Sequence, residues 1–130
     1  MHPQAHLATR VMLLPKDTNA HGTIFGGVIL SHIALAAAVE ARRHTTYKVV
    51  TVAMKEVEFL EPVYVGDLIS FYTRMVGCGR TSIRVHVEVE ALRADDMSTS
   101  IKVTEAEVIY VSVDADGEKV PHGLRVEERG

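Results

Sequence analysis

Hydrophobic residues follow two different patterns along the chain. Between Val28 and Arg43 they occupy nearly every position, with a high alanine content, which predicts a helix. Only three residues interrupt this run before its two closing arginines: Ser31, His32 and Glu40. A helix that is apolar on nearly every face is usually a buried one, so the rest of the chain is expected to cover it.

The remaining segments predict antiparallel strands. In Ile83–Ala91 apolar and polar residues alternate, as they do in a strand with one buried face. Apolar runs that end at turn-forming residues predict four more strands: Thr9–Leu14, Val49–Phe59, Leu68–Val76 and Thr99–Val113. The fold class is therefore α+β, a curved antiparallel sheet of about five strands wrapped around one long buried helix. Its open edge is expected to pair with a second copy of the chain.

Length and composition fit one domain. A chain of 130 residues can form a single domain, residues 1–130, without a metal or a disulfide as a staple. The charged tail from about residue 119 is expected to be flexible. The apolar fraction of 47% is high beside a charged fraction of 24%, and burial of the surplus between subunits would account for it.

Charge and cysteine content disfavour several classes of protein. The net charge is −3 and no long basic run occurs, which disfavours a nucleic-acid partner. The longest apolar stretch is about half of the roughly 20 residues that span a membrane, and the N-terminus lacks an apolar signal core. The single cysteine, Cys78, suits a reducing compartment. We expect a cytoplasmic protein with no membrane partner.

The segment Gly22–Gly27 (GTIFGG) directly precedes the predicted helix. It lacks the Lys-Ser/Thr pair of a nucleotide-binding loop. Two interpretations remain open. The glycines either mark a helix start, or they expose unpaired backbone N–H groups that hold a thioester carbonyl and its developing oxyanion.

The segment Gly77–Ser82 (GCGRTS) is followed by a strand rather than a helix, which excludes a dinucleotide-binding fingerprint. A hairpin turn is the simpler interpretation. The alternative is that three of its residues hold phosphate oxygens: Arg80, Thr81 and Ser82.

The titratable residues form no recognisable catalytic motif in the sequence. The seven histidines show no ligand spacing, so no metal is expected. Glu40 is interpreted as one partner of a salt bridge near the helix end. Glu105 and Glu107 are interpreted as part of a solvated strand face.

Four segments, in order, resemble the cytosolic acyl-coenzyme A thioesterases of the hotdog superfamily, the YciA-like and acyl-CoA hydrolase group. They are Leu14–Ala38 (LPKDTNAHGTIFGGVILSHIALAAA), Val49–Asp67, Gly79–Glu90 and Thr104–Asp114, and together they cover nearly all of the chain. The resemblance implies a hotdog fold and a dimer with two sites at its interface, commonly built into a trimer of dimers, a hexamer. It implies hydrolysis of fatty acyl-CoA to a free fatty acid and coenzyme A, with no cofactor.

The resemblance also implies roles for individual residues. Asn19 matches an asparagine that acts near the thioester. Gly26 and Gly27 match glycines whose amides serve as an oxyanion site. The segment formed by Gly79, Arg80, Thr81 and Ser82 matches one that lies near the coenzyme.

One position departs from the family pattern. Relatives typically carry an acid inside the helix, about one turn beyond the double glycine, where this chain has Ala34. That carboxylate acts as general base or nucleophile, and alanine can do neither. Two explanations remain open: an engineered knockout made to trap ligand, which the intact surrounding motif favours, and a natural variant that binds without turnover or uses another acid.

The functional hypotheses are therefore three. The first is an acyl-CoA thioesterase that Ala34 disables or slows. The second is a non-catalytic acyl-CoA binding or regulatory protein. The third is a hotdog dehydratase, in which His21 or His32 would supply the base.

Overall fold

The computed structural model describes residues 5–124. They form one α-helix, one short 3-10 helix and five strands. In chain order these are β1 (His6–Met12), η1 (Pro15–Asp17), α1 (Gly26–Arg42), β2 (Lys48–Phe59), β3 (Leu68–Cys78), β4 (Ser82–Arg93) and β5 (Asp96–Val113).

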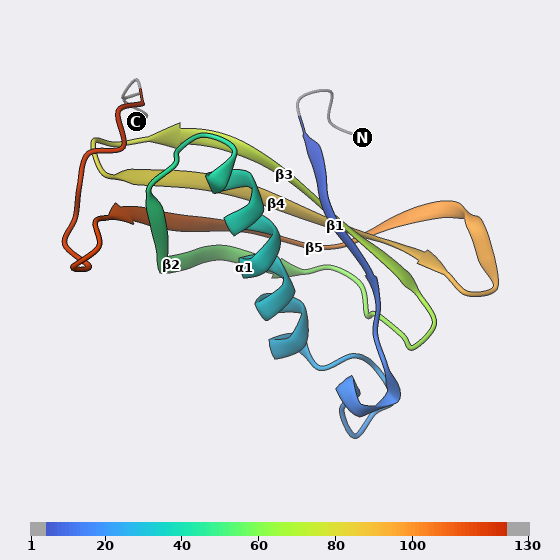
Figure 1. Cartoon of the computed structure of the whole chain (residues 1–130). Coiled ribbons are helices and arrows are strands. Elements are labelled where there is room, and N and C mark those ends of the chain that lie inside the picture. Colours follow the sequence, from blue (N-terminus) through green and yellow to red (C-terminus); the bar gives the residue numbers. More distant parts are fainter. Residues whose placement is uncertain (1–4, 125–130) are drawn as a thin grey trace.

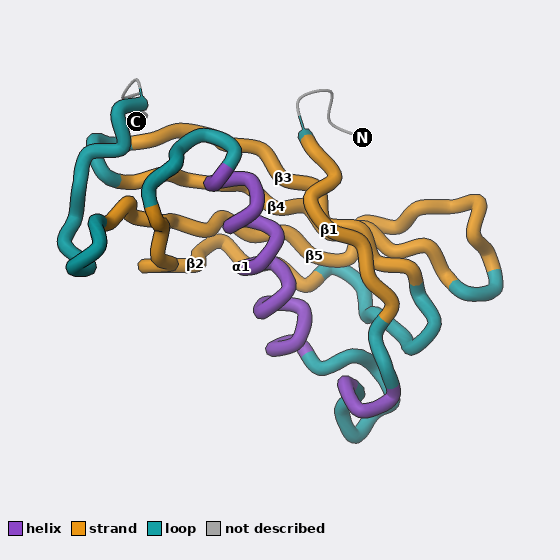
Figure 2. Tube along the Cα trace, viewed as in Figure 1, coloured by secondary structure: helices purple, strands orange, loops and turns teal. Residues whose placement is uncertain are grey.

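The five strands form one antiparallel sheet in the order β1-β3-β4-β5-β2. Strands β3, β4 and β5 follow one another as a meander, because short turns join them. The edge strands are β1, which precedes α1, and β2, which follows it. Figures 1 and 2 show that the sheet is curved and that α1 crosses one of its faces. The predicted α+β hotdog arrangement is confirmed.

The core lies between α1 and the inner face of the central strands. The apolar positions of the alternating segment in β4 are all fully buried: Ile83, Val85, Val87, Val89 and Ala91. On the helix, Ile33, Ala36 and Ala37 are fully buried against them. The small side chains of the two alanines let the helix backbone lie close to the sheet, which fixes the direction of α1.

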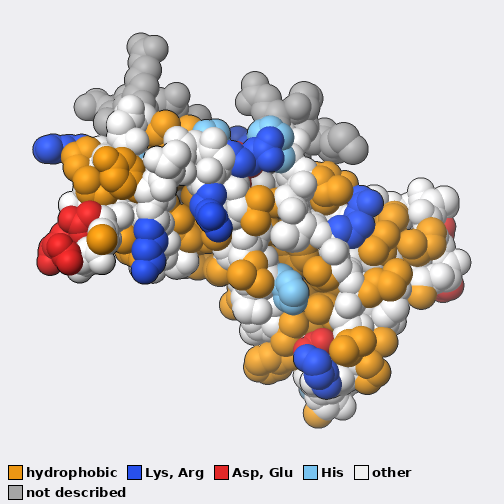
Figure 3. Space-filling model, in the orientation of Figure 1, with side chains coloured by type: hydrophobic (Ala, Val, Ile, Leu, Met, Phe, Trp, Pro, Cys, Tyr) orange, Lys and Arg blue, Asp and Glu red, His pale blue; other side chains and the backbone are white. Residues whose placement is uncertain are grey.

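The helix is not covered on every side within one chain. Leu35 is 60% exposed and Val39 is 41% exposed, one turn further along the same face. The neighbouring edge strand β2 is also largely exposed, with Val52 at 53%. Figure 3 shows apolar side chains spread over this side of the molecule. Within a single chain the rest of the protein therefore covers the helix on one side only, because one sheet can cover only one side of a helix.

Element boundaries differ from the predictions at turn residues. The helix begins at Gly26, two residues earlier than predicted, and β5 begins at Asp96, three residues before the predicted strand Thr99–Val113. The tail was expected to be flexible from about residue 119. Up to residue 124 it instead packs on the sheet: Val120 donates its N–H to the Ser112 carbonyl, and His122 is buried. The rest of the tail, residues 125–130, lies outside the described residues.

No helix among residues 5–124 combines the length and the apolar character needed to cross a membrane.

Candidate functional site

The start of α1 combines unpaired amides with close packing. Phe25 is the N-cap residue and makes no side-chain cap, while Gly26 and Gly27 are the first two helical residues. The N–H groups of a first helical turn have no partner inside the helix, so these two amides are free to bind an acceptor. A side chain at position 27 would meet the Phe25 ring at 2.8 Å. A larger residue here would require the exposed Phe25 ring to move, and the structure leaves both sequence interpretations standing.

Asn19 stabilises the loop that precedes α1. Its Oδ1 accepts the N–H groups of His21, at 2.8 Å, and Thr23, at 3.2 Å, and its Nδ2 donates to the Thr23 hydroxyl at 2.8 Å. The loop is anchored to the sheet side of the molecule, because the Ile24 N–H donates to the Val63 carbonyl at 2.7 Å. Asn19 thus has a structural role, because it helps to position the start of the helix.

A pocket of about 320 Å³ opens beside the start of α1. It lies between the first turn of the helix, represented by Gly26 and Ile29, and the segment from Phe59 to Val63. Most of its lining is apolar, as is usual for ligand pockets. One buried polar side chain lines it as well, Thr104 on β5.

Ala34 lies in the middle of the helix, half-buried. Its backbone carbonyl accepts a hydrogen bond from the Tyr110 hydroxyl on β5. Seven residues separate it from Gly27, which places it about 10 Å, or nearly two turns, along the helix axis. The expected spacing of about one turn is therefore too short. Within one chain, a side chain at position 34 does not lie next to the amides of Gly26 and Gly27.

The segment Gly79–Ser82 forms the turn between β3 and β4. The Gly79 N–H donates to the Ser82 carbonyl and to its Oγ, both at 3.0 Å, so the serine hydroxyl closes the turn. The carbonyl of Thr81 accepts the N–H of Ser112, and the Ser82 carbonyl is hydrogen-bonded to His122. The side chain of Arg80 is exposed. The hairpin-turn interpretation is correct, and the exposed guanidinium of Arg80 remains suited to a phosphate.

The candidate residues do not converge within one chain. Ser82 and Val89 are seven residues apart on β4, about 23 Å of extended strand, and Val89 pairs with Thr104 of the pocket. Figure 1 shows the β3–β4 turn at the end of the molecule where α1 finishes, and the start of α1 at the other end. A site that uses all of the predicted residues would need a second copy of the chain.

A cluster of His86, Glu88 and Glu105 lies on the sheet face opposite the helix, with ligand atoms within 4.8 Å of one another. The Lys102 ammonium already contacts Glu88 at 2.9 Å and Glu105 at 2.8 Å. These contacts raise the pKa of Lys102 well above its usual value, led by the hydrogen bond to Glu105. Lys102 therefore already supplies a cation to both carboxylates, so this cluster fits a set of ion pairs better than a metal site.

The carboxylates of this outer face are less solvated than predicted. Glu107 is buried, and it contacts Lys55 at 4.0 Å and Arg84 at 3.6 Å. Strand alternation correctly places Glu105 and Glu107 on the outer face. It does not reveal the cations beside them, which come from neighbouring strands at Glu107 and from β5 itself at Glu105.

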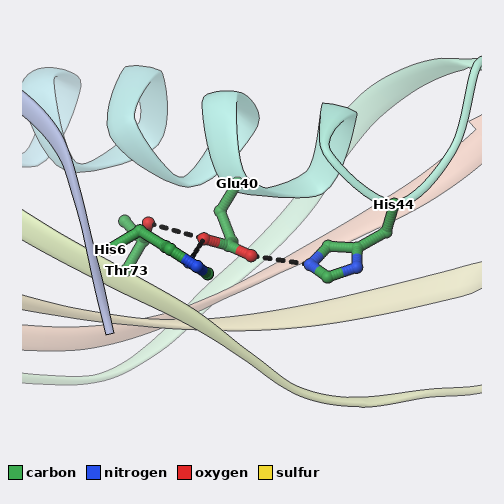
Figure 4. Close-up of polar contacts among 4 residues, drawn as sticks. All are labelled: His6, Glu40, His44 and Thr73. Atoms are coloured by element: carbon green, nitrogen blue, oxygen red, sulfur yellow. Dashed lines mark hydrogen bonds and ion pairs between the residues drawn. The ribbon is translucent and has the colours of Figure 1, made fainter. Parts of the chain in front are cut away.

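Glu40 is fully buried near the end of α1 (Figure 4). Its carboxylate is hydrogen-bonded to His44 at 2.6 Å, to His6 at 3.0 Å and to the Thr73 hydroxyl at 3.0 Å. Burial raises the pKa of Glu40, but the hydrogen bonds from His44, His6 and Thr73 outweigh it and hold the pKa below its usual value. The predicted pairing of Glu40 near the helix end exists as hydrogen bonds to two histidines, and together with the bond to Thr73 it joins the helix to β1 and β3.

The two histidines considered for a dehydratase are not placed as catalytic bases. His32 stacks on Phe71, with ring centroids 5.9 Å apart, and His21 is exposed in the loop that Asn19 organises. In the described part of the chain, no hydrogen bond or ion pair joins either ring to an acid.

Sequence reasoning missed Thr104 and Tyr110. Both lie on the inner face of β5, opposite Val89 and Ile83 of β4 respectively. A signal was present, because polar residues that share the parity of buried apolar positions on a strand point into the core. Alternation within the predicted strand Thr99–Val113 places both residues on its inner face.

Comparison with known proteins identifies the family. Residues 21–96 match the model of the thioesterase superfamily. The acyl-CoA thioester hydrolase YciA of Salmonella typhimurium is 40% identical over 121 residues, which are 92% of this chain and 91% of that protein. A hexameric hotdog-fold thioesterase of Campylobacter jejuni superposes with a TM-score of 0.87 at 44% identity, covering 94% and 93% of the two chains.

Another solved neighbour is the aspartate-to-alanine mutant of a hexameric, broad-specificity acyl-coenzyme A thioesterase. It superposes with a TM-score of 0.85 at 35% identity, covering 90% of this chain and 86% of that one. Taken with the curved sheet around one helix, these matches establish that the chain belongs to the thioesterase superfamily, among the hotdog-fold relatives of YciA.

Proposed function

We propose that the protein is an acyl-CoA thioester hydrolase, which converts acyl-CoA and water to a free acid and coenzyme A. The observation that carries the proposal is the 40% identity to an acyl-CoA thioester hydrolase over nine-tenths of both chains. The pocket beside the helix start supports it, since an apolar lining suits an acyl group and the adjoining amides of Gly26 and Gly27 suit a carbonyl oxygen.

The working unit in this proposal is an oligomer, at least a dimer and most simply a trimer of dimers. The exposed apolar residues of α1 and of the edge strand β2 provide a surface for a second copy. Assembly would also explain why Gly26, Ala34 and Arg80 lie far apart in one chain: residues of two copies would together form each site. Coenzyme A would lie with its phosphates near Arg80 and would need no metal.

A second candidate function is acyl-CoA binding without hydrolysis. The specific observation in its favour is Ala34, whose methyl group can neither activate water nor attack a thioester. The single acid of the helix, Glu40, does not substitute for a carboxylate at position 34, because both of its oxygens are hydrogen-bonded to neighbouring side chains.

One experiment separates the two functions. The purified chain is incubated with acetyl-, butanoyl-, octanoyl- and palmitoyl-CoA, and released coenzyme A is followed with a thiol reagent. Catalytic release that scales with protein concentration supports a hydrolase. Tight binding of the same esters by calorimetry, without release above the background, supports the binding protein. Absence of both would contradict the proposal in either form.

A further inference from the structure

The pocket beside the start of α1 contains a buried hydroxyl without a partner. Thr104 is 1% exposed, and its Oγ1 has no hydrogen bond within the described residues. Buried polar groups are nearly always paired, and an unpaired one costs about 1–3 kcal/mol. A ligand that fills the pocket and accepts a hydrogen bond would remove this cost.

The position of Thr104 directs its side chain toward the helix side of the sheet. It pairs with Val89 on β4, whose side chain belongs to the core, and with Phe59 on β2, which also lines the pocket. Gly26, at the start of the helix, lines the same pocket. The pocket is thus apolar with a hydroxyl from the sheet and backbone amides from the helix start.

The charge around the pocket favours a neutral acceptor over an anion. The lining includes one acid, Glu61, and no basic residue. A carboxylate or phosphate in the pocket would have no cation beside it and would be repelled by Glu61. A carbonyl oxygen accepts a hydrogen bond from a hydroxyl without carrying a full charge. A free acid formed there would be disfavoured, which would help its release.

We propose that the Thr104 hydroxyl donates a hydrogen bond to the thioester carbonyl oxygen of a bound acyl-CoA, whose acyl group lies in this pocket. The inference rests on the proposed function and names a residue that contacts the reacting group. The volume, about 320 Å³, equals that of roughly ten water molecules, so a four-carbon acyl group fits.

Thr9 provides a matched control. Its Oγ1 is the second buried hydroxyl without a partner in the described residues, but it lies on β1 and does not line the pocket. Replacing either threonine by valine removes an unpaired polar group at nearly constant volume. We expect Thr104→Val and Thr9→Val to unfold at the same temperature as the parent chain or higher. Only Thr104→Val should change ligand binding.

The test uses two ligands that cannot be hydrolysed, so it does not depend on turnover. One is the ketone analogue of butanoyl-CoA, in which a methylene group replaces the thioester sulfur. The other is S-butyl-CoA, which lacks the carbonyl oxygen. Calorimetry on the oligomer should show that Thr104→Val weakens binding of the ketone about three- to tenfold, the value of one hydrogen bond, and leaves S-butyl-CoA unchanged. Thr104→Ser should restore the affinity for the ketone, and Thr9→Val should alter neither.

Two outcomes overturn the inference while the proposed function stands. In the first, Thr104→Val binds both ligands as the parent does. In the second, it weakens both equally, which indicates altered packing rather than a lost hydrogen bond. If the parent chain binds neither ligand, the proposed function itself fails, and the inference fails with it.

Discussion

The hydroxyl of Tyr110 on β5 donates a hydrogen bond to the backbone carbonyl of Ala34 in the middle of α1. The bond ties the helix to the sheet at position 34, where the resemblance to the family implies an acid. Burial raises the pKa of the Tyr110 phenol above its ordinary value, against a smaller lowering by a hydrogen bond from Thr51. The phenol therefore stays protonated, and remains a donor, through neutral and mildly alkaline pH.

Tyr110→Phe removes the hydroxyl and leaves the Ala34 carbonyl without this hydrogen bond. We expect the free energy of unfolding to fall by about 1 kcal/mol at pH 7. The folded-state pKa lies above the ordinary tyrosine value of 10.0, so the contribution is complete below pH 10 and is lost as pH rises through the folded-state pKa. Urea unfolding between pH 7 and 11 should show that the difference in free energy of unfolding between parent and variant becomes smaller as the pH rises. A difference that stays constant would contradict a stabilising hydrogen bond from the Tyr110 phenol.

Glu40→Gln keeps the shape of the side chain but removes its charge. We expect a loss of about 1–3 kcal/mol at pH 7, because hydrogen bonds from His6, His44 and Thr73 to a carboxylate are replaced by weaker ones. The folded-state pKa of Glu40 lies below the ordinary glutamate value of 4.5, so its contribution is present above that pH and is lost as pH falls through the folded-state pKa. The variant should therefore differ most from the parent near neutrality.

Chemical unfolding of the Glu40 variant from pH 3 to pH 7 checks this expectation. Glu118→Gln is the control, because Glu118 is an exposed acid. It should track the parent at every pH. A Glu40→Gln protein as stable as the parent at pH 7 would refute a stabilising role for the buried cluster.

The exposed apolar residues predict assembly. Leu35→Glu places a charge on the uncovered face of α1, and Val52→Lys places one on the edge strand β2. Sedimentation of the parent at micromolar concentration should show no major monomer, whereas each variant should shift the distribution toward monomer. Glu118→Gln, a change at an exposed acid, serves again as the control. A parent chain that is a stable monomer would overturn a site shared between subunits.

Arg80 is expected to contact a phosphate of coenzyme A. Arg80→Ala should weaken binding of coenzyme A by about 1–3 kcal/mol through loss of a charge-assisted hydrogen bond. Arg80→Lys retains the charge but loses the planar fork, so it should recover part of the affinity. Calorimetric titration measures both. An unchanged dissociation constant in Arg80→Ala would leave Gly79–Ser82 as a turn only.

The overall fold could be predicted because local patterns agree with it. The strict alternation in Ile83–Ala91 specifies a strand, and the alanine-rich run after Gly27 specifies a helix. The short turns between β3, β4 and β5 favour antiparallel pairing of consecutive strands. The sequence could not predict which residues of the helix are exposed. Whether Leu35 is covered depends on which side of α1 faces the sheet, and a run that is apolar on all sides does not encode that choice.

The site was only partly predictable for a similar reason. The glycine pair at the helix start and the Arg80 turn are recognisable as local motifs, but distance along the chain says nothing about separation in space. The 10 Å between Gly27 and Ala34 follows from helix geometry once both residues are known to be helical. The pocket and its unpaired Thr104 hydroxyl arise from packing of three distant segments, which no single motif records.

The central claim, that this chain has the framework of an acyl-CoA thioesterase and lacks its acid at position 34, is tested most directly by the rate of coenzyme A release from butanoyl-CoA by Ala34→Asp. A carboxylate there could activate water or attack the thioester, and such groups contribute about 10²–10⁴-fold in rate. We predict an increase of that size over the parent chain, with a smaller effect on substrate binding because the gain arises in the transition state. A variant that folds, assembles and binds coenzyme A as the parent does, yet hydrolyses no faster, would contradict the claim.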